Sequence, residues 1–450
     1  MKLIKFILLI LLVEFTSLRT SAQFINNNTD IKVGSNAYVI GMGVDFIDNG
    51  TGTFTNDGTI SLDGGNWLNN STTKVFKNLN QEGLVSFTGD GIQTIGGTHI
   101  TVFESLNIAN GPKKLTLNED TVENTLSLNT KGVLQLNKQT LILDNSSTES
   151  LTSDGTGYIL SESINNKYSG TVHNDTVYGQ LQWNIGSSTA TGTVPYIVPF
   201  GDAAGDFIPL SVKVNSAGSP STGNITFATY PSNNEDLPLP SIVNTTPKGL
   251  QAYEIANRYW KIQANYTSKP DVDIDFAYSS TDVSLEKGLS AMQLLAIRYN
   301  SNENTWLDIP AAGVPGSSAN SVLDAGVKSY NLFDWWTLTA KSEIQTANVF
   351  TPNGDNVNEY FIPQINDTTS ASTPNLEGLL NYDIKIFNRW GEIVYKWSGN
   401  VSGDYKGWDG KNINNGQKCT EGAYFYVITA KGSDGVSYNK HGSVTLIDKK

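Results

Sequence analysis

Short stretches in which apolar and polar residues alternate fill the chain between about residues 51 and 145. Each stretch holds two apolar residues separated by one other residue, and Asn, Asp or Gly usually follows. Alternation with a period of two predicts a short strand with one buried face, and the following residue tolerates the left-handed geometry of a turn. The clearest units are Leu106–Ile108, Leu115–Leu117, Leu126–Leu128, Leu134–Leu136 and Leu141–Leu143.

Strands that are this short and turn this often are typical of either a parallel β-solenoid or a meander sandwich. We favour a repetitive, solenoid-like region of short turns over residues 23–150, because stacked turns bury apolar residues that a single unit cannot bury. The asparagines of these units are interpreted as structural ladders.

Beyond Asp154 the apolar stretches lengthen and prolines appear. Eight or so candidate strands without helical periodicity predict a β-sandwich over residues 151–340. Within it, the Pro- and Asn-rich stretch 231–249 predicts a long loop. The acidic alternation of Asp271, Asp273 and Asp275 predicts a strand with a solvated face rather than a cation site. A polar segment at 341–347 is interpreted as a linker.

The first 22 residues predict a secretory signal peptide. Lys2 and Lys5 precede the apolar run Phe6–Val13, which is far shorter than the roughly 20 residues that a membrane-spanning helix needs. Small residues end the segment, so cleavage is expected between Ala22 and Gln23; the alternative is an N-terminal anchor. Since no second long apolar run follows, the mature chain is not expected to be an integral membrane protein.

Charge narrows the classes of partner. The chain carries a formal net charge of −13 and has arginine only at Arg19, Arg258, Arg298 and Arg389. An acidic chain without a basic patch repels nucleic acid, so no nucleic-acid binding is expected. Its one cysteine, Cys419, cannot form an internal disulfide. High glycine content and 10% aromatic residues, in short apolar runs, favour an all-β protein.

The C-terminal residues carry five motif blocks. They are Asn348–Asn358, Ile386–Tyr395, Trp408–Gly410, Gly422–Ile428 and Gly442–Ile447. In this order they resemble the gliding-motility-associated C-terminal domain of Bacteroidetes, the type B sorting signal of the type IX secretion system, over residues 348–450. Asn356 and Glu359 depart from the commoner Gly and Asp. The motif residues are Phe350, Pro352, Asn353, Gly354, Asp355, Asn358, Asn388, Arg389, Trp390, Gly391, Trp408, Asp409, Gly410, Val444, Leu446 and Ile447.

The resemblance implies export by the type IX translocon to the cell surface or beyond, with a PorP/SprF-like outer-membrane protein as a further partner. The residues themselves predict a small β-sandwich sorting domain in which Trp390, Trp397 and Trp408 fill the core. The alternative is that these tryptophans form an exposed aromatic patch for the sorting machinery. Oxygen atoms of Asn353, Asp355 and Asn358 could surround a Ca²⁺ ion. Since the full calcium-loop pattern is missing, a plain Asx turn is favoured, and no cofactor is expected.

No catalytic set is evident in the sequence. His99, His173 and His441 lack metal-ligand spacing, and no Ser lies in a GxSxG motif. The sequence therefore predicts a non-enzymatic surface protein, a stalk or adhesin-like module. The alternative is a protein that binds or degrades surface polysaccharide. It would use aspartates such as Asp45, Asp48, Asp57, Asp63 and Asp90, or exposed aromatic residues such as Trp67, Trp183, Trp335 and Trp336.

Overall fold

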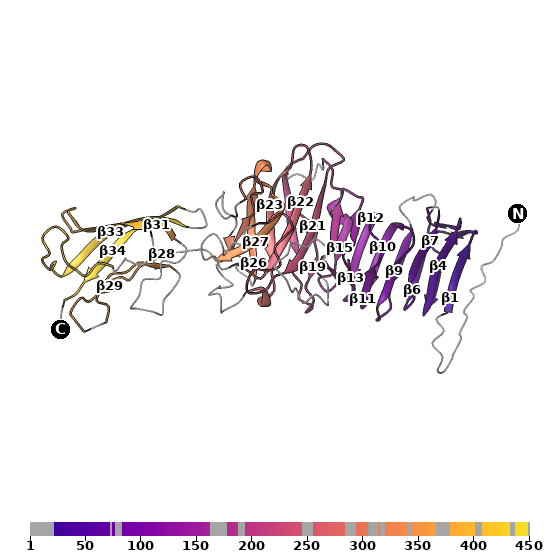
Figure 1. Ribbon diagram of the computed structural model, residues 1–450. Helices are drawn as coiled ribbons and strands as arrows, with labels where there is room; N and C mark the ends of the chain where they lie inside the picture. Colours follow the sequence, from indigo (N-terminus) through magenta and orange to yellow (C-terminus); the bar gives the residue numbers. More distant parts are fainter. Residues whose placement is uncertain are drawn as a thin grey trace.

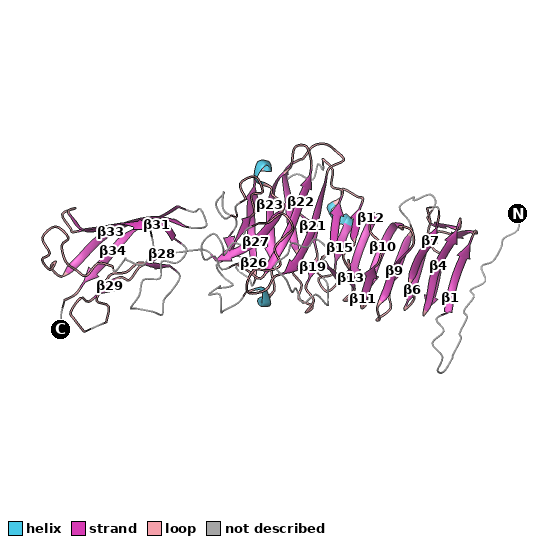
Figure 2. Cartoon of the chain, in the orientation of Figure 1, coloured by secondary structure: helices cyan, strands magenta, loops and turns pink. Residues whose placement is uncertain are grey.

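The computed structural model describes residues 22–448 except for 73, 77–82, 163–177, 188–193, 245–254, 284–293, 305, 307–313, 316–319, 341–343, 356, 366–378, 401–406 and 433–436. The described residues form strands and short 3₁₀ turns such as η1 (Thr148–Ser150), η2 (Ser280–Asp282) and η4 (Ser329–Asn331), with no α-helix among them (Figure 2). The predicted all-β class is confirmed. Of the predicted leader, only Ala22 is described, and His173 and Asn356 also lie outside the described residues.

The first part of the fold is a parallel β-solenoid, as predicted (Figure 1). Most turns place one strand on each of two long sheets. The first sheet holds β1 (Ala22–Asn27), β4 (Val44–Gly50), β7 (Trp67–Ser71), β9 (Gln93–Gly97), β11 (Pro112–Leu115), β13 (Val133–Gln135), β16 (Tyr158–Leu160) and β19 (Phe200–Gly201). The second sheet begins with β3 (Tyr38–Met42), β6 (Thr59–Asp63), β8 (Leu84–Phe87), β10 (Val102–Ala109), β12 (Asp120–Asn129), β14 (Thr140–Leu143) and β17 (Gln180–Trp183). Two shorter strands, β2 (Asp30–Val33) and β5 (Thr53–Asn56), pair on a third side, and β15 (Leu151–Ser153) pairs with β12.

The stacking register explains the spacing of the repeats. Leu106 lies beside Leu126, and Ile108 lies beside Leu128, in neighbouring turns. All four side chains are buried. The register difference makes this turn about 20 residues long. Each predicted unit therefore marks a single strand, although the unit Leu115–Leu117 overlaps its strand only at Leu115. The spacing of the units is the distance between consecutive strands of one turn.

Parallel stacking continues past residue 150, where the sequence placed the boundary of the solenoid. β14 pairs in parallel with β17, and β16 pairs in parallel with β19. The change to antiparallel pairing comes at β17, which pairs with β21 (Asn224–Pro231). From there the same sheet continues through β22 (Arg258–Asn265), β27 (Trp335–Ala340) and β24 (Leu294–Arg298).

A separate five-stranded sheet completes the sandwich. It holds β18 (Tyr196–Val198), β20 (Leu210–Ser216), β23 (Asp271–Ala277), β26 (Ser321–Val327) and β25 (Val314–Pro315). In β23 the apolar residues are buried and the aspartates are partly exposed, as the alternating pattern predicts. One hydrophobic cluster extends without interruption from Val33 in the solenoid to Leu338 in the sandwich.

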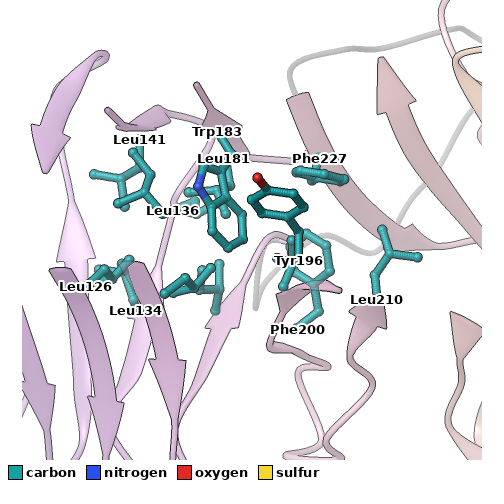
Figure 3. Packing of buried hydrophobic residues seen from close by; sticks show 14 of the residues in the cluster. Leu126, Leu134, Leu136, Leu141, Leu181, Trp183, Tyr196, Phe200, Leu210 and Phe227 are labelled. Carbon is teal, nitrogen blue, oxygen red and sulfur yellow. The ribbon is translucent and has the colours of Figure 1, made fainter. Parts of the chain in front are cut away.

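The junction between the two regions is packed with aromatic residues (Figure 3). The rings of Trp183 and Tyr196 meet edge to face, with their centroids 5.0 Å apart. Trp183 Nε1 donates a hydrogen bond to the carbonyl of Asn145, and the Tyr196 hydroxyl donates one to the carbonyl of Ser146. These bonds satisfy the polar atoms of two buried rings. Solenoid and sandwich therefore share one core.

The C-terminal residues form a separate β unit with its own hydrophobic cluster (Figure 1). Its sheet has the order β29 (Val349–Phe350), β34 (Ser437–Leu446), β33 (Gly422–Gly432), β31 (Leu379–Phe387) and β32 (Ile393–Asn400). A second layer includes β28 (Ile344–Gln345), which pairs with β30 (Gln364–Ile365). Because Ile344 is buried in this core, the unit begins inside the stretch interpreted as a linker.

Candidate functional site

The motif residues meet at one end of the C-terminal sheet. Phe350 lies beside Leu446, so the segment 351–358 leaves the sheet where β34 finishes. Phe387 lies beside Phe425 near the start of β33, so the turn that follows β31 emerges at the same end. Blocks that are far apart in the sequence are thereby brought together by strand register.

Five of the sixteen motif residues are buried and form the core at that end. Phe350, Trp408, Val444 and Leu446 are buried, and the rings of Phe350 and Trp408 lie 5.1 Å apart. Gly410 is buried with a φ of +76°, and a Cβ atom there would lie 2.9 Å from Pro352 and 3.0 Å from Leu446. Only glycine combines that backbone conformation with so close an approach.

The turn from Asn388 to Gly391 is mostly exposed. The Asn388 side-chain oxygen accepts hydrogen bonds from the backbone amides of Trp390 and Glu392, at 2.9 and 3.0 Å. This turn holds Trp390 with 75% of its surface exposed. The guanidinium carbon of Arg389 lies 5.1 Å from the centre of the Trp390 ring, within the range of a cation–π contact.

Trp390 therefore contradicts the prediction that it fills the core. It lies exposed in the turn between two strands, whereas Trp408 is buried and Trp397 packs partly buried against the core, as predicted. Sequence reasoning treated the three tryptophans alike because ring size alone favours burial.

The segment after Pro352 has the hydrogen bonds of Asx turns. The Asn353 side chain accepts from the amide of Asp355 at 3.0 Å, and the Asp355 carboxylate accepts from the amide of Val357 at 2.8 Å. Asn358 is exposed with a φ of 51°. These contacts use side-chain oxygens that a Ca²⁺ ion would need. Among the described residues, no three His, Cys, Asp or Glu side chains are grouped so as to hold a metal ion.

The outer face of the sheet holds apolar residues that the sequence analysis did not identify. Phe425 and Val427 are exposed, while Tyr424, Tyr426 and Ile428 between them are buried. The run Tyr424–Ile428 is apolar or aromatic at every position, so the sequence could have indicated apolar residues on both faces of this strand. Nearby, Cys419 is half-buried, and burial raises the pKa of its thiol.

The tryptophans considered for carbohydrate binding are all buried, which contradicts that role. Trp67 and Trp183 belong to the central cluster. Trp335 and Trp336 do point to opposite faces of β27, but both faces are covered. Trp336 faces the central cluster, whereas Trp335 lies in a second cluster with Leu239 and Val243 from the predicted loop 231–249.

Several candidate carboxylates serve the solenoid itself. Asp45 accepts two hydrogen bonds from Asn66 in the next turn, at 2.9 and 2.8 Å. Asp48 is buried and accepts from Asn26 at 2.7 Å, and Asp57 lies 3.5 Å from Lys32. Burial raises the pKa of Asp48, and its hydrogen bonds with Asn26 and Ser71 only partly oppose that effect.

A pocket of about 410 Å³ opens on the side of the solenoid. The described residues that line it include no carboxylate, so the paired acids of a glycosidase are not found in that lining. Thr98 and His99 in the lining are joined by a hydrogen bond of 3.0 Å. The lining residues are Ser71, Thr72, Lys74, Val75, Thr98, His99, Ile100 and Val102.

The comparisons with known proteins bear on the C-terminal unit alone. Residues 344–446 match the family described as the CHU_C type IX secretion signal domain. No curated protein and no solved structure matches the chain. No helix in the described part of the chain is long and apolar enough to cross a membrane.

The matched segment begins at the buried Ile344 and ends at the buried Leu446, so it coincides with the independent core. A domain of this kind directs export by the type IX secretion system to the cell surface or the extracellular space. The C-terminal region of this chain is therefore a type IX secretion signal domain, as its motif blocks predicted.

Proposed function

We propose that this chain is a non-enzymatic protein of the cell surface, in which solenoid and sandwich form a stalk or adhesin-like body carried outward by the C-terminal domain. The observation that carries the proposal is the single hydrophobic cluster from Val33 to Leu338. Because apolar side chains interlock across both regions, the body resists bending at the junction. Such stiffness suits a stalk better than a two-domain enzyme with a cleft between its parts.

The outer surface of the second sheet also supports a structural role. Its outward positions form columns of small polar residues across the turns, with Ser61 beside Ser86, Ser86 beside Asn107, and Asn107 beside Ser127. Asn107 donates a hydrogen bond to Ser86 at 2.8 Å. These ladders hold neighbouring turns together.

The absence of enzymatic activity is tested on the chain that starts at Gln23. We expect no turnover of common polysaccharides or peptides. A turnover that is abolished by Asp90→Ala, an exposed aspartate next to a turn, would overturn this part of the proposal.

The proposed export route has two steps. Residues 1–22 direct passage across the inner membrane and are removed before Gln23, and the C-terminal domain then engages the type IX translocon of a Bacteroidetes-type host. A PorP/SprF-like outer-membrane protein is the proposed partner for retention at the surface. Mass analysis of exported protein checks the first step, because a start beyond about Asp30 is incompatible with it.

The second step is tested by fusing residues 344–450 to an inert periplasmic reporter in a host with an intact type IX system. We expect the reporter to reach the surface or the medium, and the chain without residues 344–450 to stay in the periplasm. A matched fusion that begins at Asn348 lacks the buried Ile344, so it should be exported less because its fold is weaker. A reporter that stays periplasmic while the truncated chain is still exported would show the proposal to be wrong.

A further inference from the structure

The first strand of the second sheet presents three largely exposed apolar side chains. β3 is at the end of the sheet, and β6 is its one partner strand among the described residues. Its outward side chains are Tyr38, Ile40 and Met42, which are 69%, 64% and 69% exposed.

The contrast with the neighbouring turns is confined to this edge. Ile40 begins the column that continues through Ser61 and Ser86 to Asn107. In the same way, Tyr38 lies beside Thr59, and Met42 lies beside Asp63. Packing inside the solenoid does not require apolar residues at outward positions. Three of them together on the edge strand therefore indicate that something covers the edge.

Backbone groups point to the same open side. The amide of Thr59 donates to the carbonyl of Ala37, and the amide of Gly43 donates to the carbonyl of Asp63. These bonds show that the backbone N–H and C=O groups of the odd-numbered residues in and beside β3 point toward β6. The N–H and C=O groups of Tyr38, Ile40 and Met42 consequently point away from β6, along the open edge.

Natural edge strands are usually protected by charge, proline or a bulge. β3 has the sequence YVIGM and contains none of these protections in a chain whose net charge is −13. An acidic chain can bring two copies of such a strand together without placing like charges on the facing strands. The nearest acid in register, Asp63, lies one strand back on β6.

We propose that β3 pairs with β3 of a second copy of this chain, antiparallel about a two-fold axis at Ile40. In this register Ile40 faces its own counterpart, and Tyr38 faces Met42 of the other copy. All three facing pairs use the backbone groups that point along the open edge, as the hydrogen-bonded pairs of an antiparallel ladder do. The outward side chains then form one apolar patch across the seam, with an aromatic ring beside a thioether at each end.

The arrangement explains why the occupant is a second copy. A sequence that is complementary to itself about its central residue gives an isologous contact, which closes after two subunits and leaves no further β3 edge open. The two solenoids would meet end to end, with both C-terminal domains at the far ends. This inference does not depend on the proposed stalk function.

The test uses the chain that starts at Gln23, studied by sedimentation velocity over a range of concentrations. We expect a concentration-dependent dimer. Ile40→Lys should raise the dissociation constant at least about tenfold, because it places two ammonium groups opposite each other. Ile92→Lys is the matched control, since Ile92 is 67% exposed but lies outside β3, and it should dimerise as the unmodified chain does.

A second measurement covers the case in which Ile40→Lys disturbs the fold. In a Cys419→Ser background, Ile40→Cys should be joined into a covalent dimer by a short bismaleimide, whereas Ile92→Cys should not. A chain that remains monomeric at the highest attainable concentration overturns the proposal. So does a dimer that Ile40→Lys leaves intact, or one in which Ile92→Cys is cross-linked as efficiently as Ile40→Cys.

Discussion

Arg258 and Glu162 form a buried ion pair in which Nη1 lies 2.8 Å from Oε2, although the residues are 96 positions apart. Nε of Arg258 also donates to Asp282 at 2.8 Å. Glu162 follows the solenoid strand β16, whereas Arg258 begins β22 and Asp282 ends η2. Burial alone would lower the pKa of Arg258, but the two carboxylates outweigh burial and raise it. The pair therefore joins the end of the solenoid to the sandwich.

We expect Arg258→Met to be strongly destabilising. The methionine fills much of the space but leaves two carboxylates buried without a cation, and removing one partner of such a pair costs about 3–5 kcal/mol. Urea unfolding followed by tryptophan fluorescence measures the change in the free energy of unfolding.

The control removes the charges together. Glu162→Gln, Arg258→Met and Asp282→Asn in one chain should recover much of the lost stability, because no uncompensated charge is then buried. Arg389→Met, at the exposed motif turn, should leave the free energy of unfolding within about 0.5 kcal/mol of the unmodified chain. An Arg258→Met chain as stable as the Arg389→Met chain would contradict the structural role of the pair.

Asp120 makes the solenoid sensitive to pH. Its side chain is fully buried in β12, and one oxygen accepts a hydrogen bond from the amide of Thr101 at 2.7 Å. Burial raises the pKa of Asp120 to about 7, against the opposing effect of that hydrogen bond. An unfolded aspartate titrates near 3.8. Between these values the folded chain holds a proton that the unfolded chain has released, so stability falls as pH rises across this window.

Asp120→Asn keeps the oxygen that accepts from Thr101 and removes the titration. We expect the variant to be more stable than the unmodified chain at pH 7.5, while the two are closer at pH 4.5. The variant should remove a pH dependence of the free energy of unfolding on the order of 1 kcal/mol per pH unit. Chemical denaturation at several pH values measures it, and parallel curves for the two chains would refute the assignment. Lys113, whose pKa burial lowers to about 8, is present in both chains, so its titration cancels in the comparison.

Much of the fold follows from alternation in the sequence. The units beginning at Leu106 and Leu126 are adjacent strands of one sheet because short alternating strands bury one face only when turns stack. The end of the stack was not predictable in this way. Beyond residue 150, β16 still pairs in parallel with β13, and β17 still pairs in parallel with β14. Strand length and proline content do not reveal the direction of the partner strand.

The C-terminal domain shows the same limit at the level of single residues. Its motif blocks identify the family, yet they do not separate core residues from surface residues. The sandwich gives the converse case. Alternation puts Trp335 and Trp336 on opposite faces of a strand, so one of the two was expected to be exposed, but Leu239 and Val243 pack in the same cluster as Trp335. Which face of a strand is covered depends on chain segments that are distant in sequence.

Gly410 tests the close packing at the motif end of the C-terminal sheet. Gly410→Ala adds a methyl group against Pro352 and Leu446 at a φ of +76°, so we expect a loss of about 2 kcal/mol or more. Gly416→Ala is the control, because Gly416 also has a positive φ, +69°, but a Cβ atom there meets nothing within 4 Å. The isolated domain from Ile344 onward would be melted in parallel for both variants. Equal shifts in Tm would show that the contacts with Pro352 and Leu446 add nothing to backbone strain.

The last prediction separates the folding of the sorting domain from its recognition. Trp408→Ala removes a fully buried ring that packs on Phe350 and Tyr424, so it should cost about 3–5 kcal/mol and leave little folded domain. Trp390→Ala removes an exposed ring that contacts Arg389, so stability should change by less than about 0.5 kcal/mol.

Export should respond to both substitutions, but for different reasons. Trp408→Ala abolishes export of a reporter fusion because the domain unfolds, and protease digestion in the periplasm reveals this. Trp390→Ala should reduce export of a domain that remains folded and protease-resistant, since a large exposed ring held by a rigid turn is the kind of group that anchors a protein interface. If Trp390→Ala fusions are exported as well as unmodified ones, the translocon does not use this turn, and the exposed face around Phe425 and Val427 becomes the next surface to substitute.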